Sequence, residues 1–267
     1  MNLACPRRYP PVPQARFHEM VDAVCEGRYA PLDLQTYGEI EYWNTSEIRD
    51  MSRAFEDVWH FSADLSRWDV SHVTDLSEMF RNARHFNHPG VGRWDVSHAV
   101  NMRDMFADAR TFNQPLGEWD VSHVTDMGRM FADARAFNRP LGNWNVAHVV
   151  DMDEMFAGAH SFNQELGGWN VAHVVDMYGM FRGAYAFNRP LGAWNVSHVT
   201  NMAGMFADTR SFNRDLSAWD MRRVKDRSEM FRDAQSFSFS AALLQAAVAA
   251  VAADDTDMFL NAGGGRT

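Results

Sequence analysis

Histidine is the residue type whose repetition first suggests chemistry in this chain of 267 residues. An acidic or amide residue follows three positions after each histidine, and an imidazole near a carboxylate can form a pH-sensitive group. A metal ion needs ligands that converge on one point, whereas a residue repeated once per structural unit forms a line. We therefore predict no metal or cofactor site and interpret the histidines as a surface row, with a pH-sensitive edge as the functional alternative. The histidines are His72, His98, His123, His148, His173 and His198, and the following residues are Asp75, Asn101, Asp126, Asp151, Asp176 and Asn201.

Serine is the nucleophile that recurs beside these histidines, at Ser71, Ser97, Ser122 and Ser197. A catalytic serine needs one dedicated base, and a nucleophile repeated in unit after unit does not fit that requirement. The hydroxyls are suited instead to bonding the first open N–H groups of a following helix. Because every candidate acid, base and nucleophile belongs to a repeat, we predict that the protein is not an enzyme.

The element behind these patterns is a repeat of about 25 residues marked by tryptophan. The interval is constant at every step except that from Trp68 to Trp94, which is longer by one residue. A fixed period in this range is typical of a repeat array, in which each unit buries its core against its neighbours. The tryptophans are Trp43, Trp68, Trp94, Trp119, Trp144, Trp169, Trp194 and Trp219.

Each repeat combines two apolar periodicities. Trp119 and Val121 alternate as in a strand. The apolar residues that follow are spaced three, three, one, three and three, as on one face of a helix; they are Val124, Met127, Met130, Phe131, Ala134 and Phe137. The pattern predicts an α/β repeat solenoid of about eight coils, each with a short strand and a short helix. Parallel pairing at roughly 4.8 Å per coil predicts an array of about 35–40 Å.

The predicted core consists of the aromatic residue that opens each coil and the phenylalanine that follows a methionine in its second half. Asparagine recurs after the second phenylalanine of a coil, where it is suited to bonding open backbone groups at a chain reversal. The core residues are Trp68, Trp94, Trp119, Trp144, Trp169, Trp194, Trp219, Phe106, Phe131, Phe156, Phe181 and Phe206.

The motif Trp-Asp-Val-Ser-x-Val-Thr-x-Met-x-x-Met-Phe-x-x-Ala-x-x-Phe-Asn-x-x-Leu resembles the BspA-like repeat, also called the mycoplasma lipoprotein repeat of unknown function. The resemblance runs from Trp43 to about Phe237. The family is similar to leucine-rich repeats but lacks their asparagine-ladder consensus. Its members are bacterial surface proteins and also occur in algae, protists and large DNA viruses. The resemblance implies binding and adhesion, with no catalytic activity to carry over.

The ends of the chain differ from its middle. Residues 1–16 are rich in proline and predicted to be extended or disordered, and residues 17–42 are predicted to form a helical cap before the array at 43–240. Residues 241–253 favour a helix that caps the last coil, or that docks on another subunit, and residues 254–267 are predicted to be a flexible tail. Cys5 and Cys25 lie outside the repeats, and the sequence leaves open whether they pair.

Charge and targeting signals limit the partners and the location. A net charge of −10 argues against a nucleic-acid partner, and the one basic cluster, at 222–227, is interpreted as a local feature of the last coil. The apolar run at 241–251 is too short to span a bilayer. The sequence shows no signal peptide at its start, so we expect a cytoplasmic or virion-associated protein.

Two functions from different classes fit these features. The first is a non-enzymatic scaffold that binds a protein or glycan through a repetitive face of the solenoid. The alternative is a structural component of a virion or surface layer that self-associates. Binding is expected at solvent-facing positions that vary between coils, where exposed aromatic residues and arginines favour interfaces. The candidate interaction residues are Tyr178, Tyr185, Arg129 and Arg182.

Overall fold

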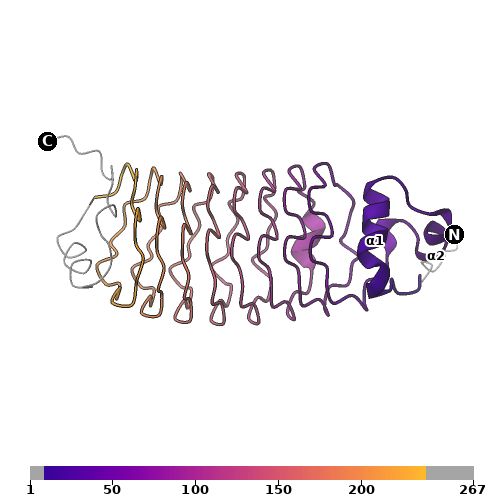
Figure 1. Cartoon of the computed structure of the whole chain (residues 1–267), viewed down its shortest axis with the longest axis horizontal. Coiled ribbons are helices and arrows are strands. Elements are labelled where there is room, and N and C mark those ends of the chain that lie inside the picture. Colours follow the sequence, from indigo (N-terminus) through magenta and orange to yellow (C-terminus); the bar gives the residue numbers. More distant parts are fainter. Residues whose placement is uncertain (1–8, 239–267) are drawn as a thin grey trace, which may run out of the picture.

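The structure, a computed structural model, describes residues 9–238 and shows a stack of coils with a helical cap at its N-terminal end (Figure 1). Its regular elements are α1 (Gln14–Cys25), α2 (Pro31–Tyr37), η1 (Ile40–Tyr42) and η2 (Pro89–Arg93), of which the last two are 3₁₀-helices. The predicted C-terminal helix at 241–253, the tail at 254–267 and Cys5 lie outside the described residues.

The N-terminal cap closes the first coil with a helix and one backbone pair. Phe17 of α1 is fully buried, and its ring lies 6.4 Å from that of Trp43 and 5.7 Å from that of Trp68. Before α1, Pro11 forms a parallel bridge with Asn44, and the Val12 N–H donates to the Asn44 carbonyl over 2.9 Å. The described part of the proline-rich segment therefore belongs to the cap, and α1 begins three residues before the predicted boundary at Phe17.

The helix predicted in each coil is absent from the array at 43–238, and consecutive β-turns replace it. Two of these turns are closed by bonds from the Met130 N–H to the Met127 carbonyl and from the Ala134 N–H to the Phe131 carbonyl. The Ala132 N–H between them closes a further turn to the Arg129 carbonyl, whereas those of Phe131 and Asp133 donate to the next coil, to Met155 over 2.9 Å and to Ala157 over 2.7 Å. The helix prediction was wrong because consecutive four-residue turns also place residues three and four apart on one side of the chain.

Two residues in each coil adopt the left-handed backbone conformation that these turns require. Arg129 and Asp133, with φ of 57° and 53°, occupy the third positions of their turns, as in type II turns. Gly158 and Gly183 hold such a position in later coils, with φ of 65° and 67°. A positive φ at both places ends any helical path, because a helix needs negative φ throughout.

The predicted strands are reduced to single bridges within the described residues. Each bridge between coils joins the carboxylate or amide residue of one coil to its equivalent in the next, as between Asp126 and Asp151. The bridge lies seven residues after the tryptophan, rather than around the Leu-x-x-Trp-x-Val segment where the sequence pattern predicted a strand. The coils are thus parallel and in register, as predicted, but they pair mainly through turns.

The core consists of columns of identical side chains that stack from coil to coil. The Trp119 and Trp144 rings lie 6.4 Å apart at an angle of 1°, and those of Phe131 and Phe156 lie 5.6 Å apart at 7°. Trp144 is only 3% exposed, and its indole N–H donates over 2.9 Å to the carbonyl of Leu116, which lies three residues before Trp119 of the preceding coil. The seven tryptophans named above as core residues are at most 5% exposed, and the five phenylalanines are fully buried. Offset stacking and hydrogen bonding both depend on this regular register.

Asparagine forms a continuous ladder at the corner after the second phenylalanine. The Asn138 side-chain oxygen accepts the Asn163 N–H over 3.0 Å, and Asn163 accepts the Asn188 N–H over 3.0 Å. The series of such bonds starts with the Asn113 N–H donating to Asn87 and ends with the Ser238 N–H donating to Asn213. The corner therefore does carry an asparagine ladder, although the motif lacks the consensus by which ladders are recognised in ordinary leucine-rich repeats.

Trp144→Ala is expected to lower the free energy of unfolding by about 3–5 kcal/mol, because it opens a cavity between two coils and removes one inter-coil hydrogen bond. Chemical denaturation followed by circular dichroism measures the change. Trp144→Phe, which keeps an aromatic ring but not the N–H donor, should cost clearly less. Equal losses in the two variants would contradict a role for the stacked ring.

Candidate functional site

The turn face, formed by the turns at residues 9 to 13 after each tryptophan, is the surface on which exposed chemistry varies most between coils. Arg129 donates to Asp104 over 2.9 Å and also pairs with Glu154, which in turn pairs with Arg182. Asp104 and Glu154 are 8% and 7% exposed. Burial raises the pKa of Asp104, while the hydrogen bond and charge of Arg129 oppose that rise. Both candidate arginines are therefore committed to ion pairs, and the network joins four successive coils, those of Trp94, Trp119, Trp144 and Trp169.

Tyr178 stands at the edge of this network with 37% of its surface exposed. The Arg182 guanidinium lies 5.6 Å from the centre of the ring and donates to the phenol oxygen over 3.2 Å. The Tyr178 N–H donates to Asp176 over 2.7 Å, so the backbone is held as well. The network thus presents one aromatic side chain to solvent in a defined position.

Tyr185 occupies a different environment. Its ring stacks on His160 at 4.3 Å, and the Arg210 guanidinium lies 3.9 Å from the ring centre. Both faces of the ring are covered, and the side chain is half-buried. The helix that would have aligned Tyr178 with Tyr185 does not exist, and the two rings differ in their partners, Arg182 for Tyr178 and His160 with Arg210 for Tyr185.

An acidic group borders the turn face where carboxylates of successive coils stack. Arg103 lies 2.7 Å from Asp153, 3.2 Å from Asp151 and 3.5 Å from Asp126. Burial disfavours the charged form of Asp151, and Asp153 and Asp126 add like charge, so the pKa of Asp151 rises from 3.8 to about 6. The cluster resembles a cation site in composition, but no three His, Cys, Asp or Glu side chains between residues 9 and 238 are placed to hold a metal ion.

Asp151→Asn is expected to stabilise the protein at neutral pH, by up to about 1 kcal/mol because water partly screens the side chain. A raised pKa means that the folded state binds the proton more tightly, so this carboxyl lowers the free energy of unfolding as pH rises from about 4 to above 6. Asn101 and Asn201 already occupy this position and accept the same backbone N–H.

Urea unfolding at a series of pH values measures the effect. The variant should match the wild type near pH 4 and exceed it above pH 6. A variant that is less stable at pH 7 would show that the ion pair with Arg103 outweighs the cost of burial.

The histidine row lies on an exposed ridge. His148 and His173 each bond through Nδ1 to a backbone carbonyl of the preceding coil, over 2.8 and 2.9 Å. Where a serine precedes the histidine, Nδ1 meets the serine oxygen instead, as at Ser122 and His123. No ion pair joins these histidines to the acidic residues three positions later within the described part of the chain.

The capping role predicted for the serines belongs to another residue. The side-chain oxygen of Asp120 accepts the Ser122 N–H over 3.0 Å, and Asn145 does the same for Ala147 over 3.2 Å. The residue directly after the tryptophan therefore satisfies the open N–H, which explains why alanine replaces serine in two coils. The relevant signal was the invariant Asp or Asn at that position.

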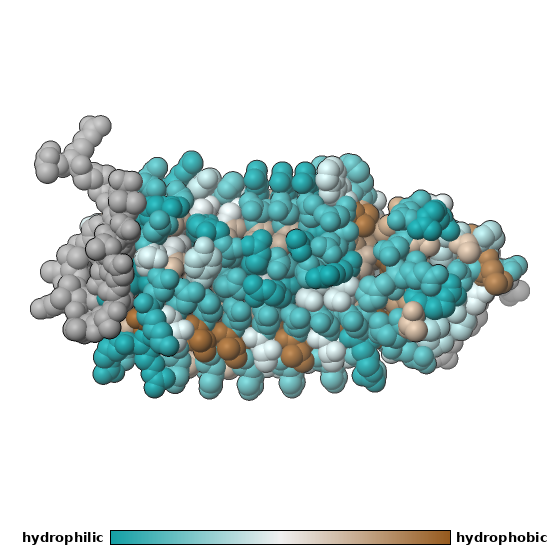
Figure 2. Space-filling model, in the orientation of Figure 1, coloured by the Kyte–Doolittle hydropathy of each residue, from teal (hydrophilic) through white to brown (hydrophobic). Residues whose placement is uncertain are grey.

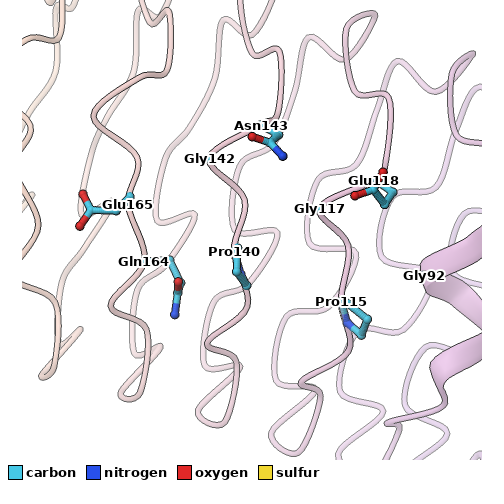
Figure 3. A pocket seen from close by; sticks show the side chains of 9 residues that line it. All are labelled: Gly92, Pro115, Gly117, Glu118, Pro140, Gly142, Asn143, Gln164 and Glu165. Atoms are coloured by element: carbon cyan, nitrogen blue, oxygen red, sulfur yellow. The ribbon is translucent and has the colours of Figure 1, made fainter.

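A groove of about 460 Å³ lies on another side of the array. Figure 3 shows its lining, which comes from successive coils. Pro115 and Pro140 supply apolar surface, while Glu118, Asn143 and Glu165 supply hydrogen-bond acceptors. Sequence reasoning missed this groove. Its signal was the glycine that recurs two residues before each tryptophan from Trp94 to Trp194, mostly as Pro-x-Gly, which leaves this column without a side chain in those coils.

Close approach between coils favours glycine in that column, most strongly at Gly92. A Cβ on Gly92 would lie 2.4 Å from the Pro115 carbonyl oxygen, and one on Gly117 would lie 3.2 Å from that of Pro140. Gly168, one position further along its coil, has nothing within 4 Å of such a Cβ. The glycine column is therefore part of the framework, and it also forms part of the groove.

Gly92→Ala is expected to lower the free energy of unfolding by about 1–3 kcal/mol, because backbone must move to admit the methyl group. Gly168→Ala provides the matched control and should be neutral or stabilising by up to about 1 kcal/mol, since alanine restricts the unfolded chain. Thermal melting of both variants makes the comparison. An unchanged melting temperature for Gly92→Ala would contradict the close approach.

A known repeat family matches the array in three overlapping segments. Residues 30–143, 88–189 and 161–264 match the family described as Mycoplasma protein of unknown function, DUF285. The chain belongs to this family. No curated protein and no solved structure matches it. The overlapping matches cover the array and identify a repeat protein of a family without an assigned function.

One observation bears on membranes. Within residues 9–238, no helix combines the length and the apolar character that crossing a bilayer requires.

Proposed function

We propose that this DUF285 repeat protein is a non-enzymatic binding scaffold and that a protein or glycan docks on its turn face around Tyr178. The observation that carries the proposal is that the core columns are nearly constant, whereas the column of Tyr178 varies between coils. Core positions repeat almost without change, whereas the position of Tyr178 holds serine, arginine, glycine, aspartate and alanine in other coils. Packing against identical neighbours constrains the core, so chemical variety is confined to positions that face solvent or a partner.

The ion pairs around Tyr178 support this surface as a binding site. Arg182 holds the ring, Glu154 holds Arg182, and Arg129 ties Glu154 to Asp104. A side chain that is already fixed loses little entropy when a partner covers it, which favours affinity. Tyrosine and arginine are also the residues that most often dominate binding energy at interfaces.

The resemblance to the BspA-like, leucine-rich-repeat-like surface proteins supports binding in preference to catalysis. It also supports the alternative, a structural component of a virion or surface layer, in which faces of the array pack against each other. We favour the scaffold because the residues of the turn face differ from coil to coil, whereas packing in a lattice is expected to use surface residues that are identical in successive coils. A cytoplasmic or virion-associated location remains part of the proposal, as does the absence of a nucleic-acid partner.

Tyr178→Ala is expected to abolish capture of the partner, at a loss of at least about tenfold in affinity for a hot-spot residue. The full chain would be immobilised and tested against a defined glycan array and, by mass spectrometry, against a cell extract. A partner is accepted only if it binds stoichiometrically to the wild type and is lost with Tyr178→Ala.

Tyr185→Ala serves as the matched control, since its ring is packed between His160 and Arg210 and should affect melting temperature rather than capture. Capture that survives Tyr178→Ala and is lost with substitutions of Glu118 and Glu165 would move the site to the groove. A protein found at high copy number in purified particles, with no heterologous partner, would favour the structural alternative.

A further inference from the structure

The histidine ridge has a composition that changes systematically along the array. We define the ridge as positions one, three, four and six after each tryptophan, counted over the eight coils. In the coil of Trp119 these are Asp120, Ser122, His123 and Thr125, and they are exposed or half-buried. The equivalents of Thr125 follow the flank of the ridge, and three of them, Val100, Val150 and Val175, are 40–44% exposed. Figure 2 shows apolar spots in a row along the lower side of the array.

The middle of the ridge is its most apolar part. In the coils of Trp144 and Trp169, asparagine replaces aspartate at the first position, alanine replaces serine at the third, and valine stands at the sixth. All three substitutions occur together in both coils, and they remove charge and hydroxyl groups from adjacent surface. The residues are Asn145, Ala147, Val150, Asn170, Ala172 and Val175.

The two ends of the ridge carry opposite charge. The first four coils hold four acidic residues and one basic residue, which are Glu47, Asp69, Asp95, Asp120 and Arg49. The coils of Trp144, Trp169 and Trp194 hold no Asp, Glu, Lys or Arg on the ridge. The last coil holds three basic residues and one acidic residue, which are Arg222, Arg223, Lys225 and Asp220.

The basic end has cations that form no ion pair within the described chain. Arg222 is paired with Asp220 at 2.6 Å. Arg223 and Lys225 are exposed, and neither forms an ion pair with a residue between 9 and 238. A hollow of about 450 Å³ lies beside them, lined by Ser197, His198, Asp220, Arg222 and Arg223.

We propose that the ridge binds the ridge of a second copy of this chain, in antiparallel orientation about a two-fold axis. A two-fold interface requires one surface to be complementary to itself, and a surface that is acidic at one end and basic at the other meets that requirement only when the copies run in opposite directions. An axis between the coils of Trp144 and Trp169 places valine against valine at the centre. It also places Arg223 and Lys225 of one copy opposite the coil of Asp95 in the other.

This arrangement matches the anatomy of an interface, with an apolar centre and a charged rim. The apolar centre is small, so the dimer should be weak and its formation should depend strongly on salt. The ridge shares no residue with the surface around Tyr178, so this dimer does not rest on the proposed scaffold function.

The test is sedimentation velocity of the full chain over a range of concentrations. We expect a reversible monomer–dimer equilibrium at an ionic strength of about 0.05 M, weakened at least about tenfold at 0.5 M because the charges are screened. The double variant Arg223→Glu with Lys225→Glu should raise the dissociation constant at least about tenfold, because it faces acid with acid.

A second double variant, His98→Arg with Val100→Lys, introduces at the facing coil the residue types found at the same two positions of the last coil. It should also weaken the dimer, since it sets basic groups against basic groups. The four substitutions combined reverse both ends and should restore most of the affinity. Val150→Thr with Val175→Thr, which copies the residue of neighbouring coils, should weaken the dimer severalfold without lowering the melting temperature.

The proposal is overturned if the wild type remains monomeric at concentrations of several hundred micromolar at low salt. It is equally overturned if the combined variant is no better than either double variant, or if the dimer is lost with Tyr178→Ala and untouched by ridge variants. Circular dichroism of each variant shows that the coils remain folded. Failure of the scaffold function leaves these measurements unchanged, so the two proposals fail separately.

Discussion

The hydrogen bonds that pass from each turn to the next coil are the interaction on which the rest of the structure depends. Alternate N–H groups along a coil close its own turns, and those between them donate to carbonyls of the following coil, as from Arg129 to Asp153 over 2.7 Å. In a helix these second N–H groups would donate within the helix, but here their only acceptors are carbonyls of the next coil. A single coil therefore has no stable structure alone, and the array gains its stability through the interfaces between successive coils.

In-register bonding forces each side chain to lie beside its own equivalent in the next coil. For aromatic residues this is favourable, since the rings stack in columns at 5.4–6.4 Å. For carboxylates it is not: burial and the neighbouring Asp153 raise the pKa of Asp151, and the stacked Asp126 of the preceding coil adds to that rise. Asn101 and Asn201 interrupt the acidic column and donate to a neighbouring carboxylate, at 3.4 Å to Asp75 and 3.2 Å to Asp176. Variation along a column is thus partly a means of avoiding repeated charge.

The same register shapes what the exterior can recognise. Substitutions within a column make the surface differ from coil to coil. Two examples are the mixed charges around Tyr178 and the change from acidic to basic residues along the ridge. A binding surface on this array consists of columns that are adjacent in space, and residues close in sequence need not belong to the same surface. Tyr178 and Tyr185 are seven residues apart in one coil, yet one lies among ion pairs on the turn face and the other is enclosed by His160 and Arg210.

The sequence by itself determined the repeat period, the register and the identity of the core residues, because a fixed spacing of tryptophan and phenylalanine is compatible only with stacked, equivalent units. It also indicated that the recurring asparagine serves the backbone at a corner. Only the tertiary structure decided between helix and turns. The apolar spacing of Val124 to Phe137 fits both, and the choice depends on acceptors that a neighbouring coil supplies. Burial within the array likewise raised the pKa of Asp151. Contacts between coils determined the enclosure of Tyr185 and the groove beside Gly92, since each arises from atoms that are distant in the chain.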